Sequence, residues 1–198
     1  MNIFLDIETA TWSPPEPALR HLILKCDTEK KLQKLQEQYA LHPYTGQIVA
    51  IGVGTKDNIV TFSQTTSLSE EDILHLFWHY VLDRTSSTPE AWRIVTYYGK
   101  EFDIPFIKIR SAILSVRPLV HLSTRKYETD RHADLFEILG EQSQSFWGKL
   151  FGYQPKCLID GSEIPQLFLE GKMEQILQKL TEDLEMLELV FDKMEPFL

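Results

Sequence analysis

Four acidic residues in three separated segments are the groups of this sequence best suited to chemistry. Asp6 and Glu8 lie in FLDIET, Asp103 lies in FDIPF, and Asp183 lies in LTEDLEML. A carboxylate is costly to bury, so an otherwise apolar segment that carries one is expected to use it for a cation or for catalysis. Gathered at one place, these carboxylates would bind divalent metal ions and support the hydrolysis of phosphodiester bonds.

The spacing of Asp6 and Glu8 suits a strand. Residues 2–6 (NIFLD) predict a short buried strand. On a strand, Asp6 and Glu8 share one face and Ile7 points into packing on the other. Two carboxylates on one face repel each other unless a cation lies between them. An edge strand that runs out into solvent is the alternative, and the apolar run before Asp6 favours a central strand.

Asp103 follows a predicted strand, RIVTYY (93–98), and a glycine turn. Gly99 is expected to take a backbone conformation that other residues resist, which reverses the chain at the end of the strand. Phe102 and Phe106 would then anchor a helix that runs from about residue 102 to 115. The alternative is that Asp103 is a solvated acid in the first helical turn, where the helix dipole favours it.

Asp183 lies on a long helix predicted near the end of the sequence. An apolar stripe recurs there at helical spacing, formed by Ile176, Leu177, Leu180, Leu184, Leu187 and Phe191. Asp183 falls on the shoulder of this stripe, so its carboxylate is expected to point toward a sheet. Glu182 and Glu185 project elsewhere and are expected to be solvated. A half-exposed acid paired with a neighbouring lysine is the alternative for Asp183.

The elements that would position these residues follow from the hydrophobic pattern. Further strands are predicted at residues 47–54 and 58–63, joined by a TKDN hairpin turn. Helices are predicted at 28–40, in SLSEEDILHLFWHYVLD, in SEIPQLFLEG and in KMEQILQKLTEDLEMLELVFDKM. Residues 11–17 (TWSPPEP) indicate a turn-rich break, and the pattern of HADLFEIL (132–139) leaves its type open. Early strands and later helices predict an α/β fold with a mixed sheet flanked by helices.

Composition sets the remaining bounds. The 198 residues suit one domain or one domain with a small excursion, and 43% are hydrophobic. A net charge of −9 argues against broad nucleic-acid binding through charge alone, although divalent cations would reverse the local sign at a carboxylate cluster. The sequence has no apolar run long enough for a bilayer, no signal-peptide pattern, and two cysteines without a pairing pattern, so we expect a cytoplasmic protein.

In order and content, the acidic segments resemble the DEDD superfamily of 3′–5′ exonucleases, which have a ribonuclease-H-like fold. FLDIET resembles the first motif of that superfamily, YYGKEFDIPF the second and LTEDLEMLELV the third. The subgroup that the sequence resembles is that of predicted exonucleases related to the proofreading domain of family-B DNA polymerases. This resemblance spans residues 1–198 as a single exonuclease-like domain, except for a helical insert around residues 13–40.

The resemblance implies a metal-dependent 3′–5′ exonuclease of ribonuclease-H-like α/β fold. Its substrate would be a nucleic-acid 3′ end, in single-stranded DNA or in RNA. The metal ligands and catalytic residues would be Asp6, Glu8, Asp103 and Asp183, which would hold two Mg²⁺ or Mn²⁺ ions about 4 Å apart. Asp6 would bridge the ions by analogy. Contacts to the substrate would come from residues of the first two motifs, namely Thr9, Tyr98, Gly99 and Phe102.

Two positions depart from the superfamily pattern. Lys179 lies four residues before Asp183, where a catalytic Tyr or His is expected. A protonated lysine accepts no proton, so Lys179 would act as a base only with a lowered pKa, and otherwise would hold a carboxylate or a phosphate. Tyr98 stands where the second motif commonly has Asn, and it would either stack on a base of the substrate or pack within the protein.

The departures leave a second hypothesis open, a catalytically weak module that binds nucleic acid or a protein partner. A third is a structural domain whose acids are merely solvated. Lys100, Lys108 and Arg110 lie near the second motif and are candidates for phosphate contacts. We expect His132 and Asp134 to have a structural polar role.

Overall fold

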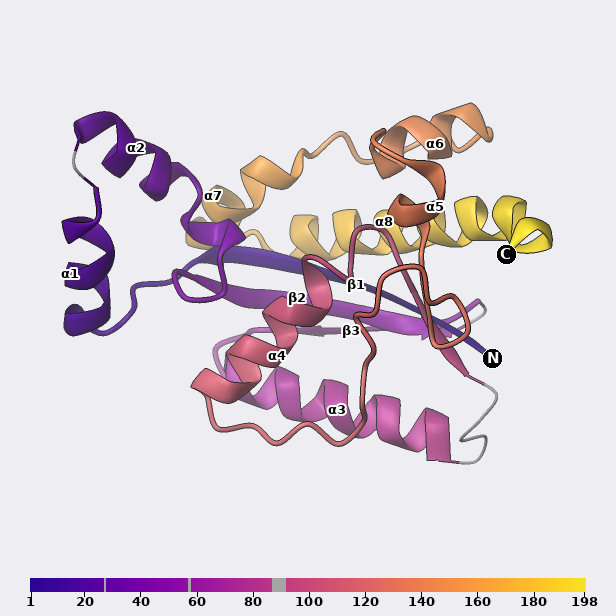
Figure 1. The fold of residues 1–198 in the computed structure, drawn as a ribbon, viewed down its shortest axis with the longest axis horizontal. Coiled ribbons are helices and arrows are strands. Elements are labelled where there is room, and N and C mark those ends of the chain that lie inside the picture. The colour runs from indigo at the N-terminus through magenta and orange to yellow at the C-terminus, as the bar shows by residue number, and fades with distance from the viewer. Residues whose placement is uncertain (27, 57, 87–91) are drawn as a thin grey trace.

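The computed structural model describes residues 1–26, 28–56, 58–86 and 92–198, and these form a sheet with helices on both faces (Figure 1). The sheet has the order β3-β2-β1-β4-β5. Its strands are β1 (Asn2–Thr11), β2 (Gly46–Thr55), β3 (Asn58–Ser63), β4 (Arg93–Thr96) and β5 (His132–Asp134). Strand β1 pairs antiparallel with β2 and parallel with β4. The predicted mixed sheet flanked by helices is therefore confirmed.

Helices cover the two faces of the sheet in separate groups (Figure 1). One face carries α3 (Glu70–Ser86) and α4 (Asp103–Ile113), and the other carries α7 (Ile164–Leu169) and α8 (Met173–Met194). The short helices α5 (Leu135–Leu139) and α6 (Gln144–Leu150) and 3-10 turns at Tyr39–Leu41, Gly161–Glu163 and Glu195–Phe197 complete the described elements. Among the described residues, no helix combines the length and the apolarity that crossing a membrane would take.

The central strand β1 is longer than the predicted residues 2–6 and is buried over both faces. Ile3, Leu5 and Ile7 pack into the apolar core beneath α3 and α4. Phe4 points the other way, into the core beneath α8. Because side chains alternate along a strand, Asp6 and Glu8 follow Phe4 and face α8. The shared face expected for these two acids is thus the face on which α8 lies.

Helix α8 approaches the sheet closely beside Asp6. Asp6 pairs with Gly52 of β2 across the ladder. A Cβ atom on Gly52 would come within 2.4 Å of Cδ1 of Leu184 and 3.1 Å of Cγ of Leu180. The absence of a side chain on Gly52 therefore allows α8 to pack directly above this part of the sheet. The predicted stripe is confirmed, with buried side chains at Ile176, Leu180, Leu184, Leu187, Val190 and Phe191.

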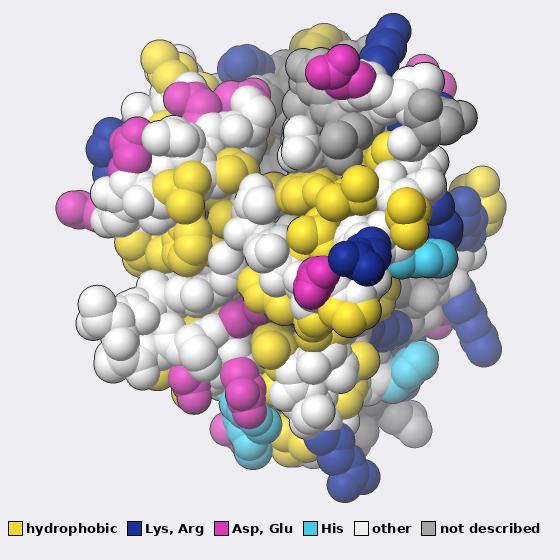
Figure 2. Space-filling view, turned by 90° about the vertical axis from the view of Figure 1, so that its left-hand side faces the viewer, with side chains coloured by type: hydrophobic (Ala, Val, Ile, Leu, Met, Phe, Trp, Pro, Cys, Tyr) yellow, Lys and Arg dark blue, Asp and Glu magenta, His cyan; other side chains and the backbone are white. Residues whose placement is uncertain are grey.

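A helical arm connects β1 to β2 and projects at the left of Figure 1. It contains α1 (Glu16–Leu24) and α2 (Glu29–Glu37), the second of which confirms the helix predicted at residues 28–40. The reading of residues 11–17 as a break missed α1, in which Pro17 lies in the first turn, where a missing N–H costs nothing. Helix α1 has no buried residue. Figure 2 views the molecule from the side of the arm and shows hydrophobic side chains at the surface among acidic and basic ones.

Two further sequence predictions concern the places where one element changes into the next. Strands β2 and β3 form the predicted antiparallel hairpin, although Asp57 of its TKDN turn lies outside the described residues. The segment 132–139, whose type was left open, changes from strand to helix at Asp134. The Asp134 carboxylate accepts a hydrogen bond from the Phe136 N–H at 3.1 Å and so caps α5. Helix α6 was not predicted.

Candidate active site

Three of the four predicted carboxylates meet between β1 and α8. Asp6, Glu8 and Asp183 each offer an oxygen atom, and these oxygens all lie within 4.8 Å of one another. Glu8 is buried, whereas Asp6 and Asp183 are half-buried. We call these three side chains the carboxylate cluster. It joins residues from opposite ends of the chain because β1 is central in the sheet and α8 packs above it.

Asp103 lies next to the carboxylate cluster but is turned toward the backbone of β1. It occupies the first turn of α4 and is 3% exposed, so the alternative of a solvated acid is wrong. Its Oδ1 accepts a hydrogen bond from the Ile7 N–H at 3.1 Å. Ile7 lies beyond the last pair between β1 and β4, Phe4 with Val95, so no strand takes that N–H. The carboxylate of Asp103 thus replaces the missing strand at this edge.

The acids of the site are electrostatically frustrated. Burial raises the pKa of Asp6 well above its usual range, and the charges of Asp103, Asp183 and Glu8 raise it further. Burial also raises the pKa of Glu8 to about 7, although Lys179 acts in the opposite direction. The pKa of Asp103 is likewise raised to about 7, with burial as the largest cause. The site therefore has more negative charge than its own positive groups balance.

Lys179 is the cation that the chain itself supplies to the cluster. Its Nζ lies 2.9 Å from Oε1 of Glu8 and also forms an ion pair with Asp183, one helical turn further along α8. Burial acts to lower the pKa of Lys179, but the charges of Glu8, Asp183 and Asp6 outweigh it and raise the pKa. Lys179 is therefore a charged donor in this structure, which favours the interpretation that it holds carboxylates over the interpretation as a base.

The donor set fits a hard divalent cation. Carboxylate oxygens are the ligands that Mg²⁺ and Mn²⁺ prefer. No described residue donates a hydrogen bond to the Asp6 carboxylate, whose pKa is raised by burial and by negative charges. A pocket of about 320 Å³ opens beside Asp183 and is lined by Lys179, Asp183 and Glu182 together with residues of the segment 145–161. The cluster is thus short of positive charge and is reached by this pocket at Asp183.

Glu182 has a role that helical projection did not reveal. It was expected to be solvated, but it is 7% exposed. Its Oε2 accepts hydrogen bonds from the backbone N–H groups of Lys156 and Cys157 at 2.9 and 2.8 Å. Glu182 thereby fixes the loop that forms one wall of the pocket. Glu185 is exposed as expected and accepts a hydrogen bond from the Tyr153 hydroxyl.

The predicted substrate-contacting residues have different surroundings. Thr9 is buried at an irregularity of β1, where the register with β2 shifts between Glu8 and Thr9. Phe102 is half-buried and packs on Phe106 with ring centroids 5.5 Å apart, so the expected anchoring of α4 is confirmed. The contacts of Thr9 and Phe102 do not test substrate binding, so the predicted contacts of these residues to the substrate stay predictions.

The expectation that Gly99 takes the unusual backbone conformation of the turn between β4 and α4 is wrong. The left-handed backbone conformation occurs at Tyr98, with φ of 66°, and not at Gly99. Gly99 is needed for a different reason, because a Cβ there would come within 2.4 Å of the Thr96 side chain. Tyr98 is 45% exposed, so its ring is available on the surface.

The prediction that Lys100 and Arg110 contact phosphates is wrong, whereas for the half-buried Lys108 it stays a prediction. Lys100 is buried and pairs with Glu137 at 2.7 Å. Arg110 is fully buried and pairs with Glu70, and Lys108 donates to the Leu122 carbonyl at 2.7 Å. Buried cations committed to internal partners are not free to bind a strand. No sequence signal distinguished them from surface lysines and arginines.

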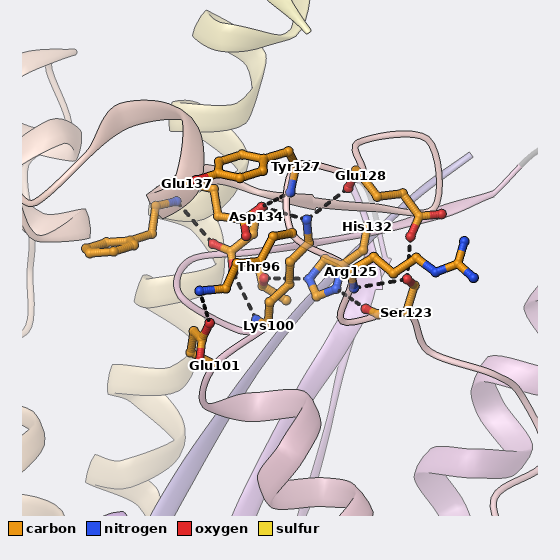
Figure 3. A network of polar contacts seen from close by, with 12 residues as sticks. Thr96, Lys100, Glu101, Ser123, Arg125, Tyr127, Glu128, His132, Asp134 and Glu137 are labelled. Atoms are coloured by element: carbon orange, nitrogen blue, oxygen red, sulfur yellow. Dashed lines mark hydrogen bonds and ion pairs between the residues drawn. The ribbon is translucent and has the colours of Figure 1, made fainter.

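His132 and Asp134 have the expected structural role (Figure 3). His132 Nε2 lies 2.7 Å from Thr96 Oγ1, and its Nδ1 lies 2.7 Å from the Ser123 carbonyl oxygen. Burial lowers the pKa of His132 to about 4, so its ring is neutral near pH 7. Asp134 accepts hydrogen bonds from the backbone N–H groups of Tyr98 and Lys100 at 2.7 and 2.9 Å.

Comparisons with known proteins agree with the fold and give the family. A family model described as "Predicted 3'-5' exonuclease related to the exonuclease domain of PolB" matches residues 38–195. No curated protein matches the sequence. The solved family B DNA polymerase of the hyperthermophilic archaeon Pyrobaculum calidifontis resembles the chain with a TM-score of 0.71 and 18% identity, covering 99% of this chain and 24% of the polymerase. This likeness confirms the ribonuclease-H-like α/β fold, and the chain spans about a quarter of the length of that polymerase.

Proposed function

Because the chain belongs to the family of predicted 3′–5′ exonucleases related to the exonuclease domain of PolB, we propose that it removes nucleotides from the 3′ end of single-stranded DNA with the help of two divalent metal ions. Membership of the family assigns the enzyme class, a 3′–5′ exonuclease that hydrolyses phosphodiester bonds. The observation that supports the metal-dependent mechanism is the meeting of Asp6, Glu8 and Asp183 within 4.8 Å.

The residues that would hold the ions are those of the carboxylate cluster with Asp103. When bound, two Mg²⁺ or Mn²⁺ ions would activate a water molecule and stabilise the charge that develops on the leaving 3′-oxygen. Asp6 would be free to hold an ion because no described residue donates a hydrogen bond to its carboxylate. Asp103 accepts the Ile7 N–H and would add a further carboxylate beside the cluster. Lys179 orients Glu8 and Asp183 by its ion pairs.

The substrate proposal rests on access and on the relative's name. The pocket at the cluster, of about 320 Å³, would receive one end of a strand rather than a duplex. The solved relative is a DNA polymerase, which supports DNA over RNA. With a net charge of −9, binding would depend on cations at the cluster and on local contacts. Faster digestion of blunt duplex than of single strands would contradict this preference.

The experiment is a time course with a 5′-labelled single-stranded oligonucleotide in Mg²⁺ or Mn²⁺. A ladder that shortens from the 3′ end, and that stops when the metal is chelated, is the expected result. Asp192→Ala provides a matched control, because Asp192 lies on the same helix as Asp183 and is ion-paired with Lys56 away from the cluster. Hydrolysis that proceeds at the same rate without metal would contradict the mechanism.

A catalytically weak binding module is the second candidate, and the charged state of Lys179 favours it. Lys179 stands where a proton acceptor is expected, yet neighbouring carboxylates raise its pKa. In that case the wild-type protein binds the oligonucleotide tightly without shortening it. Lys179→Tyr would then raise the rate. A fall in rate on this substitution would show that the lysine contributes to hydrolysis.

Two predictions about context are also part of the proposal. The helical arm of α1 and α2 between β1 and β2 supports an insert around residues 13–40 within one exonuclease-like domain over 1–198. Cys26 and Cys157 are both free thiols, which supports a reducing, cytoplasmic setting.

A further inference from the structure

A second pocket, of about 510 Å³, lies beside the turn that leads into α4. Its lining includes the aromatic side chains of Tyr98, Tyr127 and Phe136. Tyr98 and Tyr127 are 45% and 81% exposed, so neither ring belongs to the core. Phe136 meets Tyr98 edge-on with ring centroids 4.8 Å apart and supports its ring. The pocket therefore presents flat apolar surfaces to the solvent.

Both tyrosines have a backbone conformation that side chains rarely adopt. Their φ angles are 66° at Tyr98 and 61° at Tyr127. Each conformation is held by a carboxylate, since the Tyr98 N–H donates to Asp134 Oδ1 at 2.7 Å and the Tyr127 N–H donates to Glu137 Oε2 at 3.0 Å. Unfavourable backbone conformations persist where the surroundings enforce them, and they concentrate at functional positions.

Lys100 links the two supports (Figure 3). Its side chain is buried, and its Nζ donates to Glu137 Oε2 at 2.7 Å and to the Glu128 carbonyl at 2.9 Å. Its backbone N–H donates to Asp134 Oδ2 at 2.9 Å. The Lys100 ammonium therefore holds the acid that binds the Tyr127 N–H, and the Lys100 backbone N–H holds the acid that binds the Tyr98 N–H. Burying an ammonium group is costly, and here it fixes the carboxylate that supports Tyr127.

The charges around the pocket determine which kind of chemical group it can bind. Glu101, Asp134, Glu137 and Glu141 line it, with Lys126 as the lysine of the rim. Glu101 already pairs with Lys126 at 3.1 Å. This excess of acids repels a phosphate, whereas a nucleobase is neutral, offers a flat face to a ring and can donate from its amino groups to carboxylates.

The pocket and the carboxylate cluster share one turn of the chain. The Tyr98 carbonyl accepts a hydrogen bond from the Phe102 N–H at 3.0 Å, and Asp103 follows directly. Asp103 in turn binds the Ile7 N–H between Asp6 and Glu8. The turn that carries the Tyr98 ring is therefore the turn that places Asp103 beside the cluster.

We propose that Tyr98 and Tyr127 form a subsite that stacks a nucleobase of the strand whose 3′ end lies at the carboxylate cluster, and that the Lys100 side chain positions Tyr127 through Glu137. The inference rests on the proposed exonuclease function and adds to it a recognition element outside the metal-binding acids.

Binding of a 5′-labelled single-stranded oligonucleotide, measured by fluorescence anisotropy in Ca²⁺, tests the subsite. The second probe is the same oligonucleotide with abasic sites at its 3′-terminal positions. Tyr127→Ala is expected to weaken binding of the intact probe by about 5- to 150-fold and to leave the abasic probe unaffected. Tyr127→Phe should retain most of the binding, and Phe197→Ala, which removes a 78% exposed ring that does not line the pocket, is the control. Equal binding of both probes by wild type and Tyr127→Ala would overturn the subsite.

A double-mutant cycle tests the role of Lys100. Lys100→Met should weaken binding of the intact probe although the side chain is buried away from the strand, and adding Tyr127→Ala should cause little further loss. Glu137→Gln keeps an oxygen for the Tyr127 N–H and removes the ion pair, so it decides the question if Lys100→Met does not fold. Fully additive losses would overturn the positioning role.

The same variants separate this inference from the proposed function. If wild type shortens the strand and Tyr127→Ala does so with unchanged kcat and KM, the subsite is wrong and the exonuclease proposal stands. If wild type neither binds nor shortens the strand, the exonuclease proposal fails and the subsite fails with it.

Discussion

Two regions of the molecule place a glutamate beside a lysine that is buried or half-buried, and the pKa values of the two glutamates shift in opposite directions. Glu8 pairs with Lys179 in the carboxylate cluster, and burial still raises the pKa of Glu8 to about 7. Glu137 pairs with Lys100 beside the second pocket, and its pKa is lowered, since hydrogen bonds from Lys100 and the Tyr127 N–H outweigh its burial. The pKa of the paired glutamate is thus raised in one region and lowered in the other.

The difference lies in the donors that surround each pair. Around Lys100, Asp134 accepts three backbone N–H groups, from Tyr98, Lys100 and Phe136. Burial still raises the pKa of Asp134, and these three hydrogen bonds act to lower it. Around Lys179, Asp6 accepts none from the described residues and faces three further acids. A buried acid is therefore stabilised where backbone N–H groups donate hydrogen bonds to it. A group of acids without such donors marks a place for external cations.

Removing an acid from the cluster is the change with the largest expected effect. Asp6→Ala or Asp183→Ala should lower the hydrolysis rate by about 100-fold or more, because a ligand of the metal ions is lost. The fold should survive, and thermal unfolding should occur at the same or a higher temperature, because each change removes a repulsive charge. Asp192→Ala should leave the rate unchanged. Full activity in both cluster variants would place the active site elsewhere.

Exchanging each lysine for methionine should separate the two regions by their response to metal. Lys100→Met leaves Glu137 without its buried partner and should destabilise the protein by about 3–5 kcal/mol, with or without Mn²⁺. Lys179→Met should destabilise the protein in chelator and recover with Mn²⁺, because ions can replace the lost charge. Thermal unfolding of both variants with and without Mn²⁺ measures this. Equal recovery of both variants would remove the distinction between the regions.

Acid should act on the two regions in opposite directions. The folded-state pKa of His132 is lowered from 6.5 to about 4, so stability present above pH 6.5 is lost as the pH falls toward 4, by about 3 kcal/mol in total. The raised pKa values of Glu8 and Asp103 give the reverse trend, with stability lost as the pH rises through about 7.

The difference in unfolding free energy between wild type and His132→Asn isolates the histidine, because the cluster contributes equally to both proteins. This difference should shrink steadily as the pH falls from 7 to 4. The groups that face His132 are Thr96, the Ser123 carbonyl, and the more distant Lys100, Glu128 and Glu137. A difference that stays constant over this range would show that His132 does not titrate in the folded protein.

The smallest expected effect concerns the packing that brings α8 to the sheet. Gly52→Ala should cost about 1–3 kcal/mol of stability and lower the rate modestly, since Leu184 and Leu180 must move to admit a methyl group. Gly161→Ala is the control for stability only, because nothing lies within 4 Å of the Cβ that it would add but Gly161 itself lines the pocket. Denaturant unfolding and the oligonucleotide assay measure the two effects. An unchanged rate would show that the cluster tolerates a shift of α8.

The parts of the site that the sequence predicted are those set by periodicity. Alternation along β1 put Asp6 and Glu8 on one face, and helical projection put Asp183 on the side of α8 toward the sheet. Periodicity names a face but not the loop that packs on it, so the burial of Glu182 under residues 156–157 was missed. Likewise, nothing local distinguishes Lys100 from a surface lysine, because its partners lie in a segment 28 to 37 residues away.

Backbone detail was also beyond the sequence. Glycine was expected to supply the unusual conformation of the turn before α4, yet Tyr98 supplies it because Asp134 holds its N–H from another strand. A glycine is required at position 99 because a side chain there would clash with Thr96. Such choices depend on contacts between segments and not on the propensity of either residue.

The arm of α1 and α2 leaves and rejoins the sheet at a single point. Thr11 pairs with Gly46, and just beyond them the Trp12 N–H donates to the Thr45 carbonyl at 2.7 Å. The Trp12 ring also lies against Arg110, with 4.3 Å from the guanidinium carbon to the ring centroid. Since the register of β1 with β2 is closed before the arm begins, residues between Trp12 and Tyr39 can be shortened, lengthened or replaced without moving Asp6 or Glu8. This connection is accordingly the natural place to graft a tag or to accommodate differences in length among relatives.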